Sequence, residues 1–113
     1  MSVEELRHRL VSDLRELELP IEDVDIYFRP FSKTYYGRYF PVQEGVRPKI
    51  YVYPFADYGE LMTYDKILET AVHEFCHHLQ YVGGHKRIKG VMHDTQFWEL
   101  YNQYMKKAEM RLS

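Results

Sequence analysis

The spacing of apolar residues divides the first half of the chain into one helix and three strands. Leucines recur every three or four positions over residues 6–17, which is the period of an amphipathic helix. Ser2 and Glu5 form a capping-box pattern that predicts the start of this helix, and Pro20 predicts that it ends before that residue. Alternating apolar residues then predict three strands, at residues 24–28, 34–40 and 49–53. The polar segment 41–48 is expected to join the last two strands as a hairpin connection.

Helical periodicity returns in the second half. A helix is predicted from about Tyr64 to Val82, because its apolar residues recur at the spacing of one buried stripe. The residues of this stripe are Leu68, Ala71, Val72, Phe75 and Leu79. Gly83 and Gly84 follow, and glycine tolerates the left-handed conformation in which many helices end. A short turn of helix is also predicted before it, within residues 57–62.

A last helix is predicted to start near residue 94, with Asp94 or Thr95 as its N-cap. Its apolar face consists of Phe97, Tyr101, Tyr104 and Ala108. Grouped strands followed by helices indicate an α+β fold, with a three-stranded antiparallel or mixed sheet packed against helices. The order of the strands is not determined by this pattern. At 113 residues, the chain is expected to form a single domain, 1–113.

Residues 73–77 read His-Glu-Phe-Cys-His and lie within the second predicted helix. Two histidines four positions apart are separated by roughly 40° around a helix and about 6 Å along it, so both rings can bind one metal ion. Here they fall nearly opposite the apolar stripe. Glu74 lies on the adjoining flank, where it can take a proton from a metal-bound water. The motif predicts a catalytic zinc site with His73 and His77 as ligands and Glu74 as general base.

A catalytic zinc ion needs a third protein ligand, and two histidines are candidates. His93 lies just before the last predicted helix, where it can fold back over the motif. His85 follows His77 by eight residues, in a Gly-Gly-His-Lys-Arg loop. The sequence favours His93, and His85 stays open as the competing ligand. Within the motif itself, Cys76 is interpreted as a small helix residue rather than a nucleophile.

His78 is interpreted as a histidine at the edge of the core with a hydrogen-bond partner, rather than as a ligand. It lies about 100° around the helix from His77, close to the apolar stripe. Phe97 and Trp98 are expected to pack the last helix onto the motif helix.

Four segments together resemble the SprT-like family of zinc metallopeptidases. These segments are 36–39, 48–53, 68–77 and 93–98, and together they span most of residues 35–100. The resemblance implies a zincin-like fold and hydrolysis of peptide bonds in protein substrates. Asp94 departs from the family, which more often has glycine after the third histidine. Many members also carry a C-terminal zinc ribbon or DNA-binding extension, and one cysteine cannot build a four-cysteine zinc site.

Eleven tyrosines are many for this length. Most are expected to pack in strands and in the core, where tyrosine is favoured. Tyr36 and Tyr39 flank the Gly37-Arg38 pair and are the candidates for a hydroxyl that stabilises the oxyanion of peptide hydrolysis.

Charge and composition limit the partners. The net charge of −2 argues against a generally basic nucleic-acid binder, although Lys86, Arg87 and Lys89 could make a weak DNA contact. One cysteine excludes an intrachain disulfide and favours the cytoplasm. No apolar run is long enough to predict a membrane span. The competing functional class is a catalytically silent zinc-stabilised module that binds nucleic acid or a protein partner.

Overall fold

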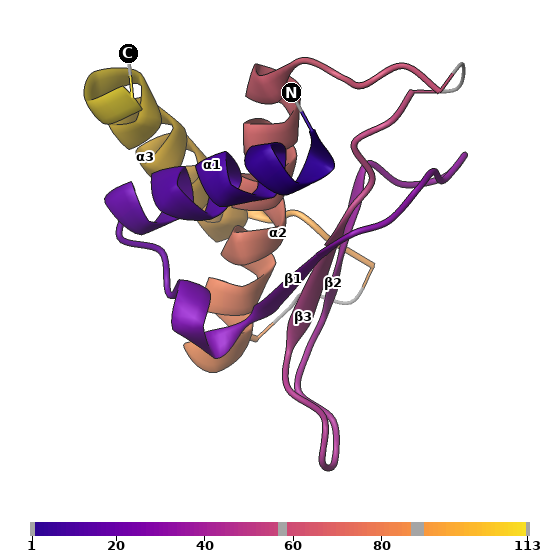
Figure 1. Cartoon of the computed structure of the whole chain (residues 1–113). Coiled ribbons are helices and arrows are strands. Elements are labelled where there is room, and N and C mark those ends of the chain that lie inside the picture. Colours follow the sequence, from indigo (N-terminus) through magenta and orange to yellow (C-terminus); the bar gives the residue numbers. More distant parts are fainter. Residues whose placement is uncertain (1, 57–58, 87–89, 113) are drawn as a thin grey trace.

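The computed structural model describes residues 2–56, 59–86 and 90–112 and has the predicted α+β architecture (Figure 1). Three α-helices and a three-stranded sheet form the fold, with one short 3-10 turn, η1, between the first helix and the first strand. In chain order the elements are α1 (Val3–Glu16), η1 (Ile21–Asp23), β1 (Asp25–Phe28), β2 (Gly37–Phe40), β3 (Lys49–Val52), α2 (Tyr64–Val82) and α3 (Thr95–Leu112).

The sheet is mixed, with the strand order β1-β3-β2. β2 and β3 form the expected antiparallel hairpin, in which Tyr39 lies opposite Ile50. β1 pairs with β3 in parallel, and Tyr27 lies opposite Tyr51. The central position of β3 leaves β2 at one edge of the sheet. This arrangement lies within the prediction of an antiparallel or mixed sheet and supplies the strand order that the sequence did not determine.

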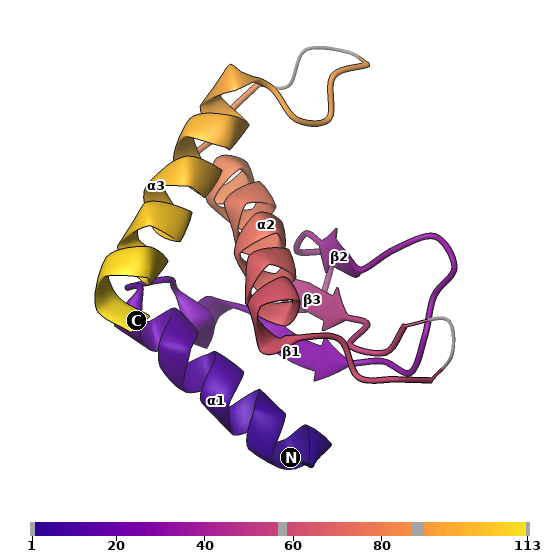
Figure 2. The ribbon, with the colours of Figure 1, turned by 90° about the horizontal axis from the view of Figure 1, so that it is seen from above.

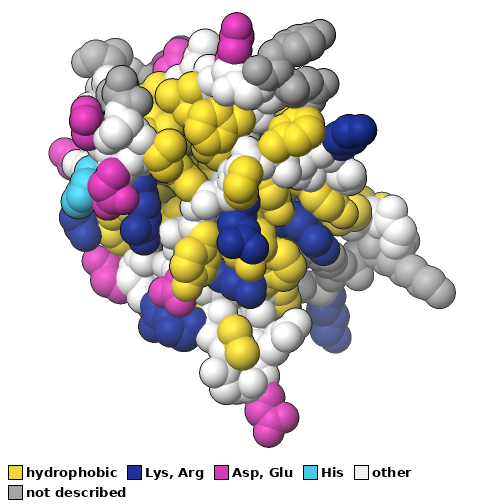
Figure 3. Space-filling view, turned by 45° about the vertical axis from the view of Figure 1, so that its right-hand side comes forward, with side chains coloured by type: hydrophobic (Ala, Val, Ile, Leu, Met, Phe, Trp, Pro, Cys, Tyr) yellow, Lys and Arg dark blue, Asp and Glu magenta, His cyan; other side chains and the backbone are white. Residues whose placement is uncertain are grey.

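The helices lie together on one side of the strands, with α2 against the sheet and α1 and α3 beside α2 (Figure 2). The predicted leucine stripe of α1 is fully buried, as is most of the apolar stripe of α2. Ile26, Ile50 and Val52 supply the inner face of the sheet, so one core fills the space between the layers. None of the helices in the described part of the chain covers the opposite face of the sheet, and Figure 3 shows Lys and Arg side chains among hydrophobic ones on that side.

Local side-chain chemistry determines where the helices begin and end. The Ser2 hydroxyl accepts a hydrogen bond from the Glu5 backbone N–H, which confirms the predicted cap of α1. The Thr63 hydroxyl does the same for α2 by accepting from the Lys66 N–H. Gly84 has a φ of +70°, a left-handed conformation that suits glycine, and its N–H donates to the Tyr81 carbonyl.

Two predictions about local structure differ from the fold. The strand predicted at 34–40 begins only at Gly37, because the Ser32 hydroxyl accepts hydrogen bonds from the N–H groups of Thr34 and Tyr35. The predicted turn of helix at 57–62 is wrong for residues 59–62, which are not helical, and residues 57 and 58 lie outside the described residues. Leu61 instead forms an isolated antiparallel bridge with Phe55, and the Ala56 N–H donates to the Glu60 carbonyl. Within the described residues, no helix has both the length and the hydropathy to cross a membrane.

The buried leucines of α1 should contribute strongly to stability. Leu10 is fully buried, and truncating a buried leucine to alanine removes apolar contact and leaves a cavity. We expect Leu10→Ala to lower the free energy of unfolding by about 2–5 kcal/mol, measured by urea denaturation. The matched control is Met110→Ala, which truncates a side chain that is 76% exposed and should change stability little. Equal stability of the two variants would contradict this account of the core.

Candidate metal centre and its cleft

Three histidines from two separate segments converge beside the sheet. His73 and His77 lie one turn apart on α2, and His93 lies in the segment just before α3. The Nε2 atoms of His73 and His93 are 3.0 Å apart, and the ligand nitrogens of all three rings lie within 4.8 Å of one another. The three histidines are therefore close enough to hold a single metal ion.

The chemistry of this donor set fits a divalent transition metal. Nitrogens that surround one tetrahedral zinc ion lie about 3.3 Å apart, close to the spacing of His73 and His93. Burial lowers the pKa of His73 to about 4, and repulsion by His93 and Lys66 acts in the same direction. This ring is therefore neutral near pH 7, and the neutral form is the one that binds metal. Three imidazoles also leave further coordination positions open, as catalytic sites require.

Phe97 forms an apolar floor under the three histidines. Its ring centroid lies 4.8 Å from that of His73 and 4.7 Å from those of His77 and His93. Phe97 is fully buried, so its contacts hold α3 on α2, as the sequence predicts. An apolar surround of this kind excludes water from the back of a metal site and fixes the orientation of the rings.

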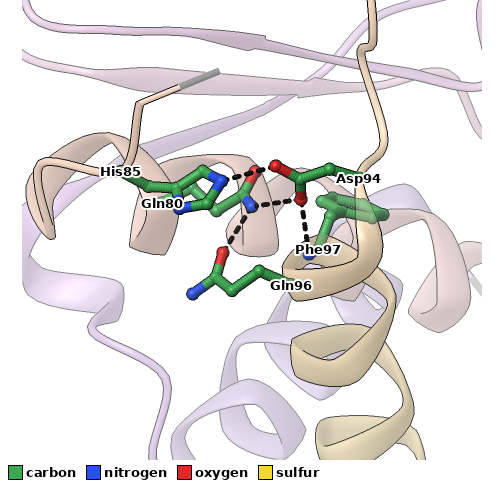
Figure 4. Close-up of polar contacts among 5 residues, drawn as sticks. All are labelled: Gln80, His85, Asp94, Gln96 and Phe97. Atoms are coloured by element: carbon green, nitrogen blue, oxygen red, sulfur yellow. Dashed lines mark hydrogen bonds and ion pairs between the residues drawn. The ribbon is translucent and has the colours of Figure 1, made fainter. Parts of the chain in front are cut away.

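A polar network attaches the C-terminal part of α2 to the start of α3 (Figure 4). Asp94 caps α3, because its Oδ1 accepts a hydrogen bond of 2.9 Å from the Phe97 N–H. The other carboxylate oxygen pairs with Nε2 of His85, and the Gln80 amide donates to both Asp94 and Gln96. The bond from His85, followed by that from the Phe97 N–H, lowers the pKa of Asp94 to about 2. The network holds the residue next to His93 in place.

The two candidate third ligands lie in different surroundings. His85 bonds to Asp94 and does not belong to the histidine cluster, whereas His93 does. His85 thus pairs with Asp94, a contact that its spacing from His77 in the sequence could not reveal. Asp94 is the predicted cap. Asp94 also accepts a hydrogen bond from Gln80. This contact joins two elements, so it could not be predicted from the sequence of either one alone.

Glu74 lies in the wall of the same site. Its side chain is 7% exposed, and burial raises the pKa of its carboxyl to about 7. The Glu74 side chain points toward β2 rather than into bulk solvent. Glu74 and His77 are both more buried than residues on a solvent-facing side of a helix would be. A carboxyl group with a pKa near neutrality can accept and return a proton at physiological pH.

Gly37 makes this position of Glu74 possible. A Cβ atom at Gly37 would lie 2.6 Å from Cγ2 of Thr70 and 3.1 Å from Cγ of Glu74. It would also lie 3.2 Å from the Tyr51 carbonyl oxygen, so the space is closed on the backbone side as well. Glycine is required here for the close approach of β2 and α2, and not for an unusual backbone angle.

The site opens into a cleft of about 710 Å³ between α2 and β2. His73, Glu74 and His77 line one wall, and Tyr35, Arg38 and Tyr39 line the other. A second hollow of about 280 Å³ continues on the other flank of the site and is lined in part by Tyr36, Lys66 and Tyr101. Because both hollows include His73 and Glu74, the cleft passes the site on two sides.

The two tyrosines predicted to assist the reaction lie in different surroundings. Tyr39 reaches α2, where its hydroxyl lies 2.7 Å from Nδ1 of His78. This contact gives His78 the expected hydrogen-bond partner, although His78 is fully buried rather than at the core edge. Tyr36 is 60% exposed, and its ring lies under the Lys66 ammonium. Tyr35 and Tyr101 also line the cleft, and the sequence did not single out either as a site residue.

The remaining candidates are placed as follows. Cys76 is buried, and burial, together with the nearby Glu74, raises the pKa of its thiol to about 12, so it is a poor nucleophile. Lys86 is exposed next to His85, whereas Arg87 and Lys89 lie outside the described residues. Comparisons of the sequence with models of protein families and with curated proteins find no match.

Metal binding should distinguish the roles of His93 and His85. We expect one divalent ion per chain in wild type after zinc loading and desalting, measured by elemental analysis. His93→Ala should lose most of this metal because it removes a ligand, whereas His85→Ala should retain it. His8→Ala, on the exposed face of α1, is the matched control. Metal lost from His85→Ala but kept in His93→Ala would move the third ligand to His85.

The close approach at Gly37 should be visible in stability. Gly37→Ala forces β2 and α2 apart, and overpacking of this kind costs about 1–3 kcal/mol. Gly45→Asn is the control, because Gly45 has open space around it and asparagine tolerates its φ of +73°. Urea denaturation of both variants provides the measurement. A Gly37→Ala protein as stable as wild type would show that the two elements can separate without cost.

Proposed function

We propose that this protein is a zinc-dependent metallopeptidase of the SprT-like type, which hydrolyses peptide bonds in protein substrates. The observation that carries the proposal is the position of Glu74, which is buried in the cleft wall beside the three clustered histidines. A metal site that only stabilised the fold would not require a buried carboxylate beside its ligands. Such a carboxylate costs free energy to bury, so a chemical role accounts for it.

His73, His77 and His93 would hold the metal ion. When bound, zinc would act as a Lewis acid that polarises a carbonyl group and makes a nearby water molecule more acidic. Glu74 takes the proton from the water that attacks the substrate carbonyl carbon, and then delivers it to the leaving nitrogen. The apolar floor formed by Phe97 and the burial of Glu74 limit competing contacts with bulk water.

The shape of the cleft supports an extended substrate. Hollows on both sides of His73 and Glu74 leave room for chain on either side of a scissile bond. Tyr35 and Tyr39 line the wall facing the histidines and can contact substrate side chains. We keep Tyr36 and Tyr39 as candidates for oxyanion stabilisation, with the Tyr39 hydroxyl already bonded to His78.

The competing proposal is a catalytically silent zinc-stabilised module that binds nucleic acid or a protein partner. It explains the histidine cluster but leaves the buried carboxylate without a role. A weak DNA contact through Lys86, Arg87 and Lys89 is compatible with either function. The cytoplasm is our proposal for the compartment, because a single cysteine suits a reducing environment.

Replacing Glu74 separates the two proposals. We expect zinc-loaded wild type to cleave unfolded casein, and Glu74→Gln to reduce the rate by about 100-fold or more, because general-base catalysis contributes that much. Zinc content is measured on the same samples and should be unchanged by the substitution. The matched control is Glu99→Gln, an exposed position on α3. Product formation is followed by gel and by mass spectrometry.

Two results would overturn the peptidase proposal. One is full activity in Glu74→Gln, which would point to a contaminating protease and remove the role of Glu74 that carries the proposal. The other is no cleavage of unfolded proteins or peptides by wild type that carries one zinc ion per chain, which would favour the binding module.

A further inference from the structure

The face of the sheet that points away from α2 is an open surface of aromatic rings and cations (Figure 3). Side chains alternate along a strand, so every second residue of each strand points to this side. We define the outer sheet face by eight residues: Tyr27, Arg29, Arg38, Phe40, Arg47, Lys49, Tyr51 and Tyr53. None of them belongs to the histidine cluster or to its floor.

The rings of this face form a continuous group around the central strand. The Tyr51 ring lies at its middle, with the Phe40 ring centroid 4.9 Å away, that of Tyr27 6.1 Å away and that of Tyr53 6.4 Å away. Tyr27 is 46% exposed, so at least one ring presents much of its surface to solvent. The Tyr27 and Tyr53 rings stand nearly perpendicular to that of Tyr51, at 85° and 84°, so the group presents ring edges as well as π-faces.

Three of the four cations of this face lie over its rings rather than beside a carboxylate. The Arg29 guanidinium carbon is 4.8 Å from the Tyr51 ring centroid, and that of Arg38 is 4.8 Å from the Phe40 centroid. The Lys49 ammonium is 5.2 Å from both rings. These distances are typical of cation–π contacts, which orient a cation without neutralising its charge.

The charge balance of this face is opposite to that of the whole chain. Among the described residues of β1, β2 and β3, Asp25 supplies the carboxylate, and it pairs with Arg47 at 3.3 Å. Arg29, Arg38 and Lys49 keep their positive charge, although the chain as a whole carries −2. A hollow of about 290 Å³ is lined by the rings of Tyr27 and Tyr51, by three cations, and by Asp25, whose carboxylate pairs with Arg47. An anionic group could enter this hollow beside the other two cations, Arg29 and Lys49.

We propose that the outer sheet face binds single-stranded nucleic acid. Bases stack on Tyr27, Tyr51 and the neighbouring rings, and phosphates pair with the arginines and Lys49. Exposed bases and a charged backbone match this combination of aromatic platform and cations. An acidic peptide would use the cations but leave the rings without planar partners, and a duplex hides its bases within the stack.

The proposal is independent of the peptidase reaction but adjoins its cleft. Arg38 lies on the edge strand β2 and lines the cleft as well as the outer sheet face. Its guanidinium also lies 4.8 Å from the ring of Tyr35, another residue of the cleft. A strand bound across the sheet would therefore pass close to the entrance of the cleft.

The test is fluorescence anisotropy with the full chain and labelled 20-nucleotide oligo(dT) and oligo(U) probes at low salt. We expect saturable binding that weakens steeply as salt rises, because phosphate contacts release counterions. Arg29→Gln/Arg38→Gln should reduce the salt slope by about 1.4, because each phosphate contact on a single strand contributes roughly 0.7. Tyr27→Ser should weaken binding about tenfold by removing a stacking surface. The relative affinities of the two probes identify DNA or RNA as the preferred strand.

The controls separate this site from general charge attraction. Lys106→Gln/Arg111→Gln removes two cations from exposed positions on α3 and should leave binding unchanged. Circular dichroism establishes that each variant is folded. The proposal is overturned by any of three results: no binding of single strands at low salt, equal affinity for a duplex of the same length, or equal competition by polyglutamate. Binding that survives both the arginine and the tyrosine substitutions would overturn it as well.

Discussion

The close packing of α2 against β2 is the constraint on which the site depends. At Gly37 the two elements approach so closely that even a methyl group would collide with Thr70 and Glu74. Successive turns of α2 place Thr70, Glu74 and His78 toward β2, while His73 and His77 turn toward α3. The same rigid helix thus presents the proposed base, Glu74, and two of the three clustered histidines from adjacent flanks. Any loosening of this contact would move all three groups together.

His93, the third histidine of the cluster, is held in place by a different set of contacts. His93 does not lie on a helix, so packing of a helix face cannot orient it. Instead its neighbour Asp94 is fixed by the cap of α3, by His85 and by Gln80. The buried ring of Phe97 packs against the three histidines. A ligand on a loop needs such support, because backbone entropy would otherwise oppose metal binding.

The sequence predicted the features that depend on local chemistry. The helices followed from the 3.6-residue period and their caps, and the histidine cluster followed from the i, i+4 spacing and the helix junction. Features that depend on distant contacts were not accessible. Alternation along β1 shows which residues face the core but not that β1 pairs in parallel with β3. The sequence placed His77 opposite the apolar stripe of its helix and Glu74 on the adjoining flank, but it did not reveal that β2 and α3 cover them. Likewise, the bond between His85 and Asp94 depends on how a loop folds, which no spacing reveals.

Because side chains alternate along the strands, the single sheet separates the residues of the cleft and core from those of the outer sheet face. Gly37 and Tyr39 of β2 face α2 and form the cleft wall, whereas Phe40 faces outward. On β3, Ile50 and Val52 enter the core, and Tyr51 between them joins the outer sheet face. A substitution at an outward position can therefore change the charge or stacking of that face without disturbing the histidines. Arg38 is the exception, because its long side chain at the sheet edge reaches both surfaces. A ligand or substitution on one face of the edge strand β2 would therefore affect the other face through Arg38.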